Sequence, residues 1–349
     1  MKIYMILFAS IVIMTMACKN DKELEDAPDV SNIKVDVEFI RFDQEVMHIS
    51  PTDIQKGYEN LRGKYAAMTD LYFKNVIQLQ PASDSVLNTD ALKAFITDEK
   101  VKVLQDTIDV VMTDLSAEII DIQKSLKYYK YYFPDKTIPR IYGCNSGFGY
   151  QRFIFDDDGE RDGIGLGLEM FLGNEFPYKQ VDPKNPIFSE YLTRTFNKAH
   201  MARTIVDMLV DDLIGEAPGV RLIDQMIHHG KKLYIIDKLM PFVSDTILHE
   251  YTEKQMDWCK KNEKEMWSYF FDQKLFYETN AMKISKYLNP APTSQGMPSD
   301  SPGRTANYIA WRIVQAYMEK FPDTTLQDLI KMRDAQKLLE LSKYKPKRT

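Results

Sequence analysis

Long stretches of helical periodicity constrain the fold of this 349-residue chain more than any other feature. Between residues 89 and 133, apolar side chains recur every three or four residues, which places them on one face of a helix. Ser301 and Pro302 are predicted as the N-cap and first residue of a later helix. The same periodicity predicts helices over residues 52–80, 187–213, 217–240, 252–288 and 302–320.

Strand signals are fewer and shorter than the helical ones. Apolar and polar residues alternate strictly over residues 33–42, which is typical of a half-buried strand. Further strands are expected near Ile138 and over 148–155 and 163–172, the last two joined as a hairpin. The order of elements predicts an α+β fold that is mostly helical with a small β-sheet.

The acidic connection of this hairpin resembles a calcium-binding loop in part. Asp158, Glu160, Asp162, Gly163 and Glu169 match the template positions that supply oxygen ligands or the sharp turn. The flanking segments are predicted strands, whereas an EF-hand needs helices, and the eighth position is glycine instead of an apolar residue. A solvated hairpin tip is therefore the preferred interpretation.

The first 17 residues have the organisation of an export signal. A basic residue, Lys2, precedes a short apolar run that ends in a small residue before Cys18, and the run is too short to span a bilayer comfortably. This ending resembles the lipobox of bacterial lipoproteins, although Thr15 stands where leucine is usual. Acylation of Cys18 would anchor the protein to a lipid membrane; a plain secretory signal and an uncleaved anchor are the alternatives.

The segments after the signal complete the predicted organisation. Residues 18–32 are rich in charged residues and are predicted to form a flexible tether, and 33–349 to form a single domain. Cys144 and Cys259 are expected to be buried free thiols, since no disulfide framework is present. The net charge of −6 and the absence of a basic stripe with interleaved aromatic residues argue against nucleic acid as a partner.

Two of the five histidines are adjacent, in the stretch I-D-Q-M-I-H-H-G-K-K (residues 223–232). Neighbouring helical residues point about 100° apart, so His228 and His229 do not both face one ion from a regular helix. His229 is expected to face inward and His228 outward, with pH sensing or a partner contact as alternatives to a structural role. No zinc-peptidase H-E-x-x-H string is present; the nearest, at His249 and Glu250, lacks the second histidine.

Two further blocks carry a family resemblance. The first block is G-I-G-L-G-L-E-M-F-L-G-N-E-F-P-Y (163–178), and the second is S-P-G-R-T-A-N-Y-I-A-W-R-I-V-Q-A-Y-M (301–318), with Trp258 and Trp267 between them. They are considered together with the lipobox-like end at Cys18. Together they resemble the gliding-motility lipoprotein GldB family of Bacteroidota. The resemblance implies a zincin-like body with a small sheet and a C-terminal helical lobe.

The resemblance also implies what the site has lost. Zincin-like peptidases carry H-E-x-x-H on one helix and a glutamate ligand before a glycine on a second. Here His200 stands at the first position, Met201 and Thr204 replace the glutamate and second histidine, and His229 replaces the later glutamate. The metal positions His200, Thr204 and His229 are thus expected to be degenerate, with no catalytic residue, no metal and no cofactor.

The implied function is that of a non-catalytic envelope protein required for gliding motility and the associated type IX secretion machinery. It would contact other proteins of that machinery and be held by its lipid at the inner or outer membrane, with the body periplasmic. The alternative is an envelope zinc-dependent peptidase that uses His200 with His228 or His229.

Overall fold

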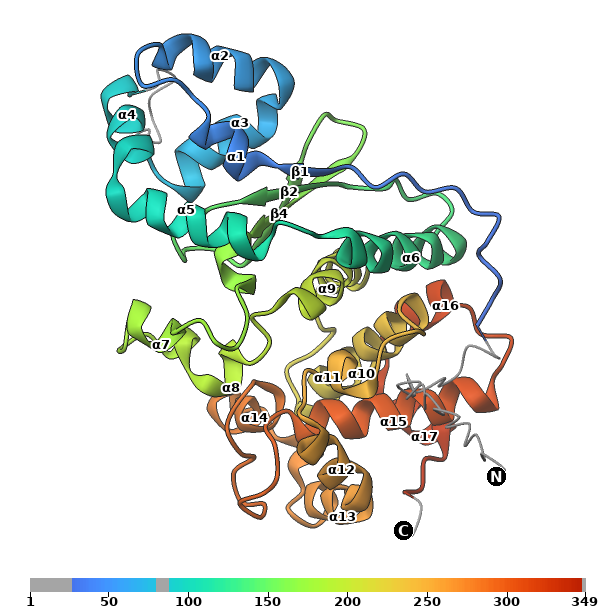
Figure 1. The fold of residues 1–349 in the computed structure, drawn as a ribbon. Coiled ribbons are helices and arrows are strands. Elements are labelled where there is room, and N and C mark those ends of the chain that lie inside the picture. Colours follow the sequence, from blue (N-terminus) through green and yellow to red (C-terminus); the bar gives the residue numbers. More distant parts are fainter. Residues whose placement is uncertain (1–26, 80–87, 347–349) are drawn as a thin grey trace, which may run out of the picture.

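The protein folds around a small mixed β-sheet, described by a computed structural model that covers residues 27–79 and 88–346 (Figure 1). The strand order is β1-β2-β4-β3; β1, β2 and β4 are parallel and β3 is antiparallel to β4. The predicted signal peptide, Cys18 and most of the tether lie outside the described residues. The strands are β1 Phe39–Arg41, β2 Arg140–Cys144, β3 Arg152–Asp156 and β4 Asp162–Gly167.

Helices cover both faces of this sheet and extend well beyond it (Figure 1). The mostly helical α+β class expected from the sequence is confirmed. The helices before β2 are α1 Phe42–Met47, α2 Ile54–Lys64, α3 Ala66–Leu71, α4 Thr89–Thr97, α5 Glu99–Val111 and α6 Ser116–Tyr132. Those after β4 are α7 Tyr178–Val181, α8 Glu190–Thr193, α9 Met201–Ile214, α10 Leu222–Leu239, α11 Asp245–His249, α12 Glu253–Lys261, α13 Glu263–Asp272, α14 Ala281–Leu288, α15 Thr305–Lys320, α16 Leu326–Lys331 and α17 Ala335–Ser342.

The sheet separates two hydrophobic cores because successive strand residues point to opposite faces. Tyr142 and Cys144 of β2 belong to the smaller core, which α1 to α4 cover. Ile141, Ile164 and Leu166 belong to the larger core, which contains α6, α9, α10 and α15. Cys144 and Cys259 are both buried free thiols, as expected.

The glycines of β4 allow the aromatic rings of β3 to lie directly on the sheet. A Cβ atom at Gly165 would lie 2.1 Å from the ring of Phe153, and one at Gly163 would lie 2.4 Å from the ring of Phe155. β3 and β4 pair as the predicted hairpin, and its acidic tip is exposed. The alternating glycines therefore serve strand packing.

Glu169 lies far from this exposed tip, in the interior. Its side chain accepts hydrogen bonds from the backbone N–H groups of Ser146 and Phe148, both at 2.9 Å, and from the Ser146 hydroxyl. Complete burial raises the pKa of Glu169 to about 7, although these hydrogen bonds act in the opposite direction. The carboxylate thereby fixes the loop between β2 and β3 against the turn after β4.

Several predicted elements are shorter or broken in the structure. The alternation over 33–42 yields a strand of only three residues, Phe39–Arg41. The predicted helices 52–80 and 252–288 are each divided into shorter helices, the second because Asn262 ends α12 and the chain turns before α13. The predicted cap at Ser301 is wrong: α15 begins at Thr305, after Arg304 in a left-handed conformation that cannot continue a helix.

The long helices α10 and α15 cross at very short range. A Cβ atom at Gly230 of α10 would lie 2.5 Å from the carbonyl carbon of Ala310 in α15, so only glycine fits there. Because that neighbour is backbone, it cannot swing aside as a side-chain end would. The glycine that follows the histidine pair is thus required by helix packing.

Replacing Gly230 with alanine is expected to lower the free energy of unfolding by about 1–3 kcal/mol, the usual cost of overpacking a core. Gly63→Ala is the matched control, since Gly63 also lies in a helix and its Cβ would meet no atom within 4 Å. That substitution should stabilise by up to about 1 kcal/mol through helix propensity. Urea unfolding of both variants measures the difference; equal effects would contradict the close crossing.

Candidate functional site

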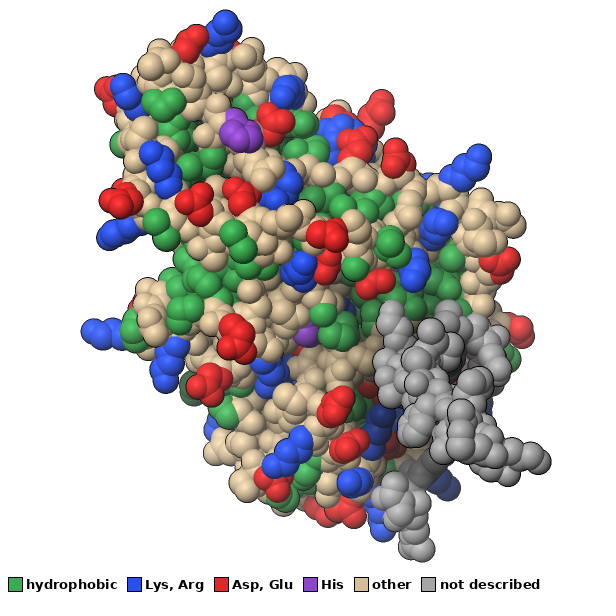
Figure 2. All heavy atoms as spheres, viewed as in Figure 1, with side chains coloured by type: hydrophobic (Ala, Val, Ile, Leu, Met, Phe, Trp, Pro, Cys, Tyr) green, Lys and Arg blue, Asp and Glu red, His purple; other side chains and the backbone are tan. Residues whose placement is uncertain are grey.

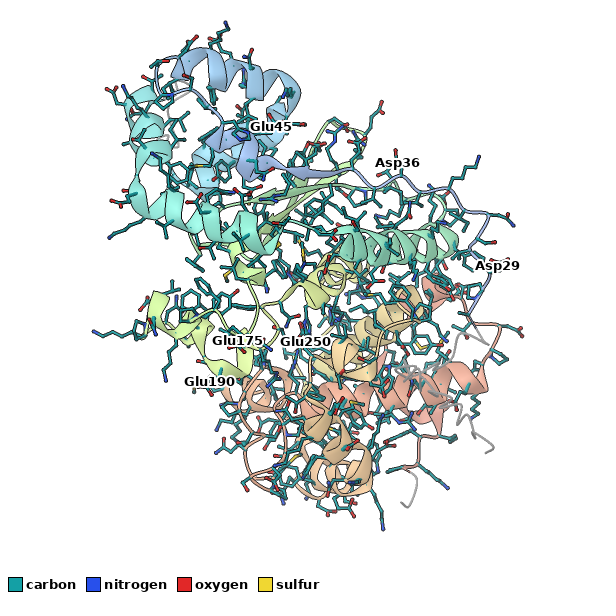
Figure 3. All side chains as sticks on the ribbon, viewed as in Figure 1. Asp29, Asp36, Glu45, Glu175, Glu190 and Glu250 are labelled. Atoms are coloured by element: carbon teal, nitrogen blue, oxygen red, sulfur yellow. The ribbon has the colours of Figure 1, made fainter. Side chains whose placement is uncertain are left out.

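The described feature with the character of a site is a cavity of about 380 Å³, lined by both charged and apolar side chains. It lies where β3, α9, α10 and the start of α15 meet the segments around residues 187–196, 249–251 and 288–290. Figure 3 places Glu250 at the centre of the molecule, between α9 and α11. The cavity is thus built from parts of the chain that are distant in sequence.

A buried carboxylate, Asp207, organises one side of the cavity. Its Oδ1 accepts a hydrogen bond from Arg203 Nη1 at 2.6 Å, and its Oδ2 lies 2.6 Å from Arg152 Nη2 and 2.9 Å from Lys232 Nζ. Burial raises the pKa of Asp207, but attraction to Arg203, Arg152 and Lys232 outweighs it and holds the pKa well below its usual value. Asp207 is therefore a permanent anion that joins β3, α9 and α10.

A second ion pair, between Glu250 and Arg304, forms the opposite side. Arg304 Nη1 donates to Glu250 Oε2 at 2.5 Å, and Arg304 Nη2 donates to the backbone oxygens of His249 and Glu250. Arg194 Nη2 also donates to the backbone oxygen of Glu250, at 2.8 Å. Burial raises the pKa of Glu250, but Arg304 and Arg203 lower it to about 2.

The partners in this pair both have left-handed backbones. The φ angles are 53° for Glu250 and 60° for Arg304, in the region that L-residues rarely adopt. Such a conformation costs on the order of 1 kcal/mol for each residue, and it persists only where the surroundings impose it. The ion pair and the arginine contacts to backbone oxygens supply that constraint at the cavity wall.

Cations outnumber carboxylates around the cavity. Asp207, Asp211 and Glu250 are the three carboxylates in these ion pairs. The five cations are Arg152, Arg194, Arg203, Lys232 and Arg304. The local excess is two positive charges, in a protein whose net charge is −6. Elsewhere, on the face shown in Figure 2, acidic and basic side chains are interspersed.

The predicted histidines are brought near the cavity but do not converge on one point. His229 lines it, whereas His228 lies beside His229 with ring centroids 5.8 Å apart and the planes at 78°. His200 precedes α9, where its Nδ1 lies 3.0 Å from Asn197 Oδ1, and Thr204 is buried. Within residues 27–79 and 88–346, no group of three His, Cys, Asp or Glu side chains is arranged to hold a metal.

The residues that shape the site were mostly missed from the sequence. α9 directs Arg203 and Asp207, one helical turn apart, into the cavity. The signal was present as an arginine and an aspartate with i, i+4 spacing in the largely apolar first half of the helix. Arg152 and Arg304 carry no such local signal, because their partners lie on other elements.

Comparison with known proteins decides the family. The family model for gliding motility protein GldB matches residues 23–346, almost the whole chain. The chain belongs to the GldB family. No curated protein and no solved structure was found to be significantly similar.

Membership in the GldB family identifies a gliding motility lipoprotein and implies a location at the cell envelope, in association with a membrane. Among the helices of the described residues, none is both long enough and apolar enough to cross a bilayer.

The histidines near the cavity make stability depend on pH. Burial lowers the pKa of His200, His228 and His229 to about 4 in each case, with nearby cations contributing. Unfolding restores their pKa to about 6.5, so the unfolded chain binds more protons between pH 4 and 6.5. The contribution of these histidines to stability is complete above pH 6.5 and is lost as the pH falls towards 4. Glu169 acts in the opposite sense: its pKa is raised in the folded state, so its contribution is lost as the pH rises.

Replacing His200, His228 and His229 together with glutamine is expected to reduce the loss of unfolding free energy between pH 7 and pH 5. Urea unfolding at each pH measures this loss. His48→Gln is the control, since His48 is exposed at the end of α1 and does not line the cavity. An unaltered pH dependence in the triple variant would show that these histidines are not buried as neutral groups.

Proposed function

We propose that this GldB family member is a lipid-anchored, non-catalytic component of the envelope apparatus for gliding motility and the associated secretion machinery. It acts through contacts with other proteins of that apparatus. The family match supports the role in motility. The observation that carries the non-catalytic part is the ion-pair cluster at Asp207, which occupies the cavity-facing side of α9.

The acids of the cavity are poorly suited to proton transfer. General acid–base catalysis works best with a group whose pKa lies near the operating pH. The pKa of Glu250 is about 2 and that of Asp207 is also held low, so both stay ionised and bound to cations near neutrality. These carboxylates position arginines instead of exchanging protons.

The thiols are equally unsuited to nucleophilic chemistry. A reactive cysteine needs access and a lowered pKa, because the thiolate is the nucleophile. Cys144 and Cys259 are both buried, and burial raises the pKa of each thiol. Both thiols therefore support a packing role.

A degenerate zincin-like site is part of the proposal. In that arrangement His200, Thr204 and His229 stand at the former ligand positions. His200 directly precedes α9 and Thr204 lies in its first turn, whereas His229 lies on α10 and lines the cavity. Arg203 lies between His200 and Thr204 in the sequence, and it forms an ion pair with Asp207, one turn further along α9.

The rival function is a zinc-dependent peptidase that uses His200 with His228 or His229. It is favoured by the position of His229 in the cavity and by the low pKa of these histidines, since neutral imidazole is the form that binds zinc.

Elemental analysis of the purified full chain separates the two functions. The non-catalytic role predicts no stoichiometric, tightly bound zinc in the wild type, and no change on replacing His200 with alanine. His48→Ala serves as the control, because His48 is exposed and remote from the predicted ligand set. One zinc per chain that is lost only in His200→Ala would establish the rival.

The lipid anchor is proposed at Cys18, which lies outside the described residues. Cleavage before Cys18 and acylation of its thiol would leave a short tether to the body. Ala27 and Val30, which belong to the described end of the predicted tether, pack against the larger core. Several acyl chains on one cysteine give stable anchoring.

Cys18→Ala is expected to move the protein from the membrane fraction to the soluble fraction after washing, because its only proposed anchor is removed. Cys259→Ala is the matched control, since it removes a buried thiol from the body and should leave the protein in membranes. Fractionation and immunoblotting of cells measure the distribution. Wash-resistant membrane association of Cys18→Ala would refute the anchor.

A further inference from the structure

The cavity combines a basic side with an apolar wall. Arg152, Arg203, Lys232 and Arg304 contribute the cationic groups. The apolar wall consists of Ile187, Leu192, Phe196, Leu233, Leu288 and Pro290. A concave site with a few convergent charged groups and apolar surroundings is the usual form of a small-molecule pocket, and about 380 Å³ lies within the range of such pockets.

Hydrogen-bond donors remain available on the basic side. Arg203 is only 4% exposed and uses Nη1 for Asp207 and Nε for the backbone oxygen of Leu248. Its Nη2 group has no partner among the described residues. Among the described residues, Arg152 forms ion pairs only through Nη2, with Asp207 and Asp211. Its Nε and Nη1 groups have no partner there. A guanidinium with unused N–H groups is suited to planar, bidentate binding of an oxyanion.

The charge balance favours an anion at the same place. Arg152, Arg203 and Lys232 all converge on the single carboxylate of Asp207, and Lys232 also reaches Asp211 at 2.5 Å. Cations so close together repel one another, most strongly where burial lowers the effective dielectric constant. An additional anion would relieve this repulsion without displacing Asp207.

We propose that this cavity binds an organic oxyanion, a carboxylate or phosphate attached to an apolar body. The oxyanion accepts hydrogen bonds from Arg152 and Arg203 beside Lys232, and the apolar wall covers the carbon part. The site is independent of the lipid anchor and of the proposed role in motility, because it depends only on the cavity residues.

Calorimetric titration of the full chain in non-ionic detergent at low ionic strength tests the site. The probes are phenyl phosphate and benzoate, with benzamide as the uncharged comparison of similar shape. We expect at least one anion to bind tenfold or more tightly than benzamide, and its affinity to fall as salt is added. Tighter phenyl phosphate assigns a phosphate ligand, and tighter benzoate assigns a carboxylate.

The variants Arg152→Gln and Lys232→Gln should each weaken binding of that anion at least tenfold. Their side chains are 33% and 15% exposed, so each can be replaced with less risk to folding than the buried Arg203. Lys254→Gln is the matched control, because Lys254 is exposed on α12 and does not line the cavity.

Circular dichroism and urea unfolding establish that each variant is folded before titration. One folded variant of the two is enough to test the site. The proposal is overturned if neither anion binds more tightly than benzamide, or if a folded Arg152→Gln or Lys232→Gln variant binds the anion as the wild type does.

Discussion

The ion-pair cluster at Asp207 joins the parts of the molecule that would otherwise be independent. Arg152 belongs to the edge strand β3, Arg203 shares α9 with Asp207, and Lys232 belongs to α10. A buried carboxylate without partners would be strongly destabilising, so its position fixes where the cations must lie. The sheet edge and the two central helices are thereby held in one arrangement, and residues of all three line the cavity.

The second ion pair closes the cavity from the other direction. Glu250 and Arg304 adopt left-handed backbones at the end of α11 and the start of α15, and each holds the other in place. Local strain of this kind is tolerated where surrounding contacts determine it completely. Because Arg304 also donates to backbone oxygens, the two segments behave as one wall.

The same electrostatics that argue against catalysis favour binding. Cations keep Asp207 and Glu250 ionised near neutral pH, so neither carboxyl group is suited to exchange a proton there. They also leave an excess of positive charge and unused N–H groups on Arg152 and Arg203. In the proposed non-catalytic role, an anion bound in this cavity would be a ligand instead of a substrate.

Local sequence patterns predicted much of the fold because they reflect interactions between near neighbours. Helical periodicity predicted the helical content, and glycine-rich alternation with an acidic turn predicted the hairpin of β3 and β4. The helix breaks were missed: Asn262 and Arg304 end or delay helices through the packing of the chain around them, which periodicity does not record.

The sequence by itself determined the mostly helical α+β class and the family, and the angular spacing of helical residues already argued that His228 and His229 do not bind one ion together. Only the tertiary structure decided that α9 directs Arg203 and Asp207 into a cavity that His229 lines. The physical reason is the distance along the chain over which each interaction acts. Periodicity arises from residues one turn apart, whereas the pairing of Asp207 with Arg152 depends on which helix face meets which strand, and that is settled only when the whole core packs.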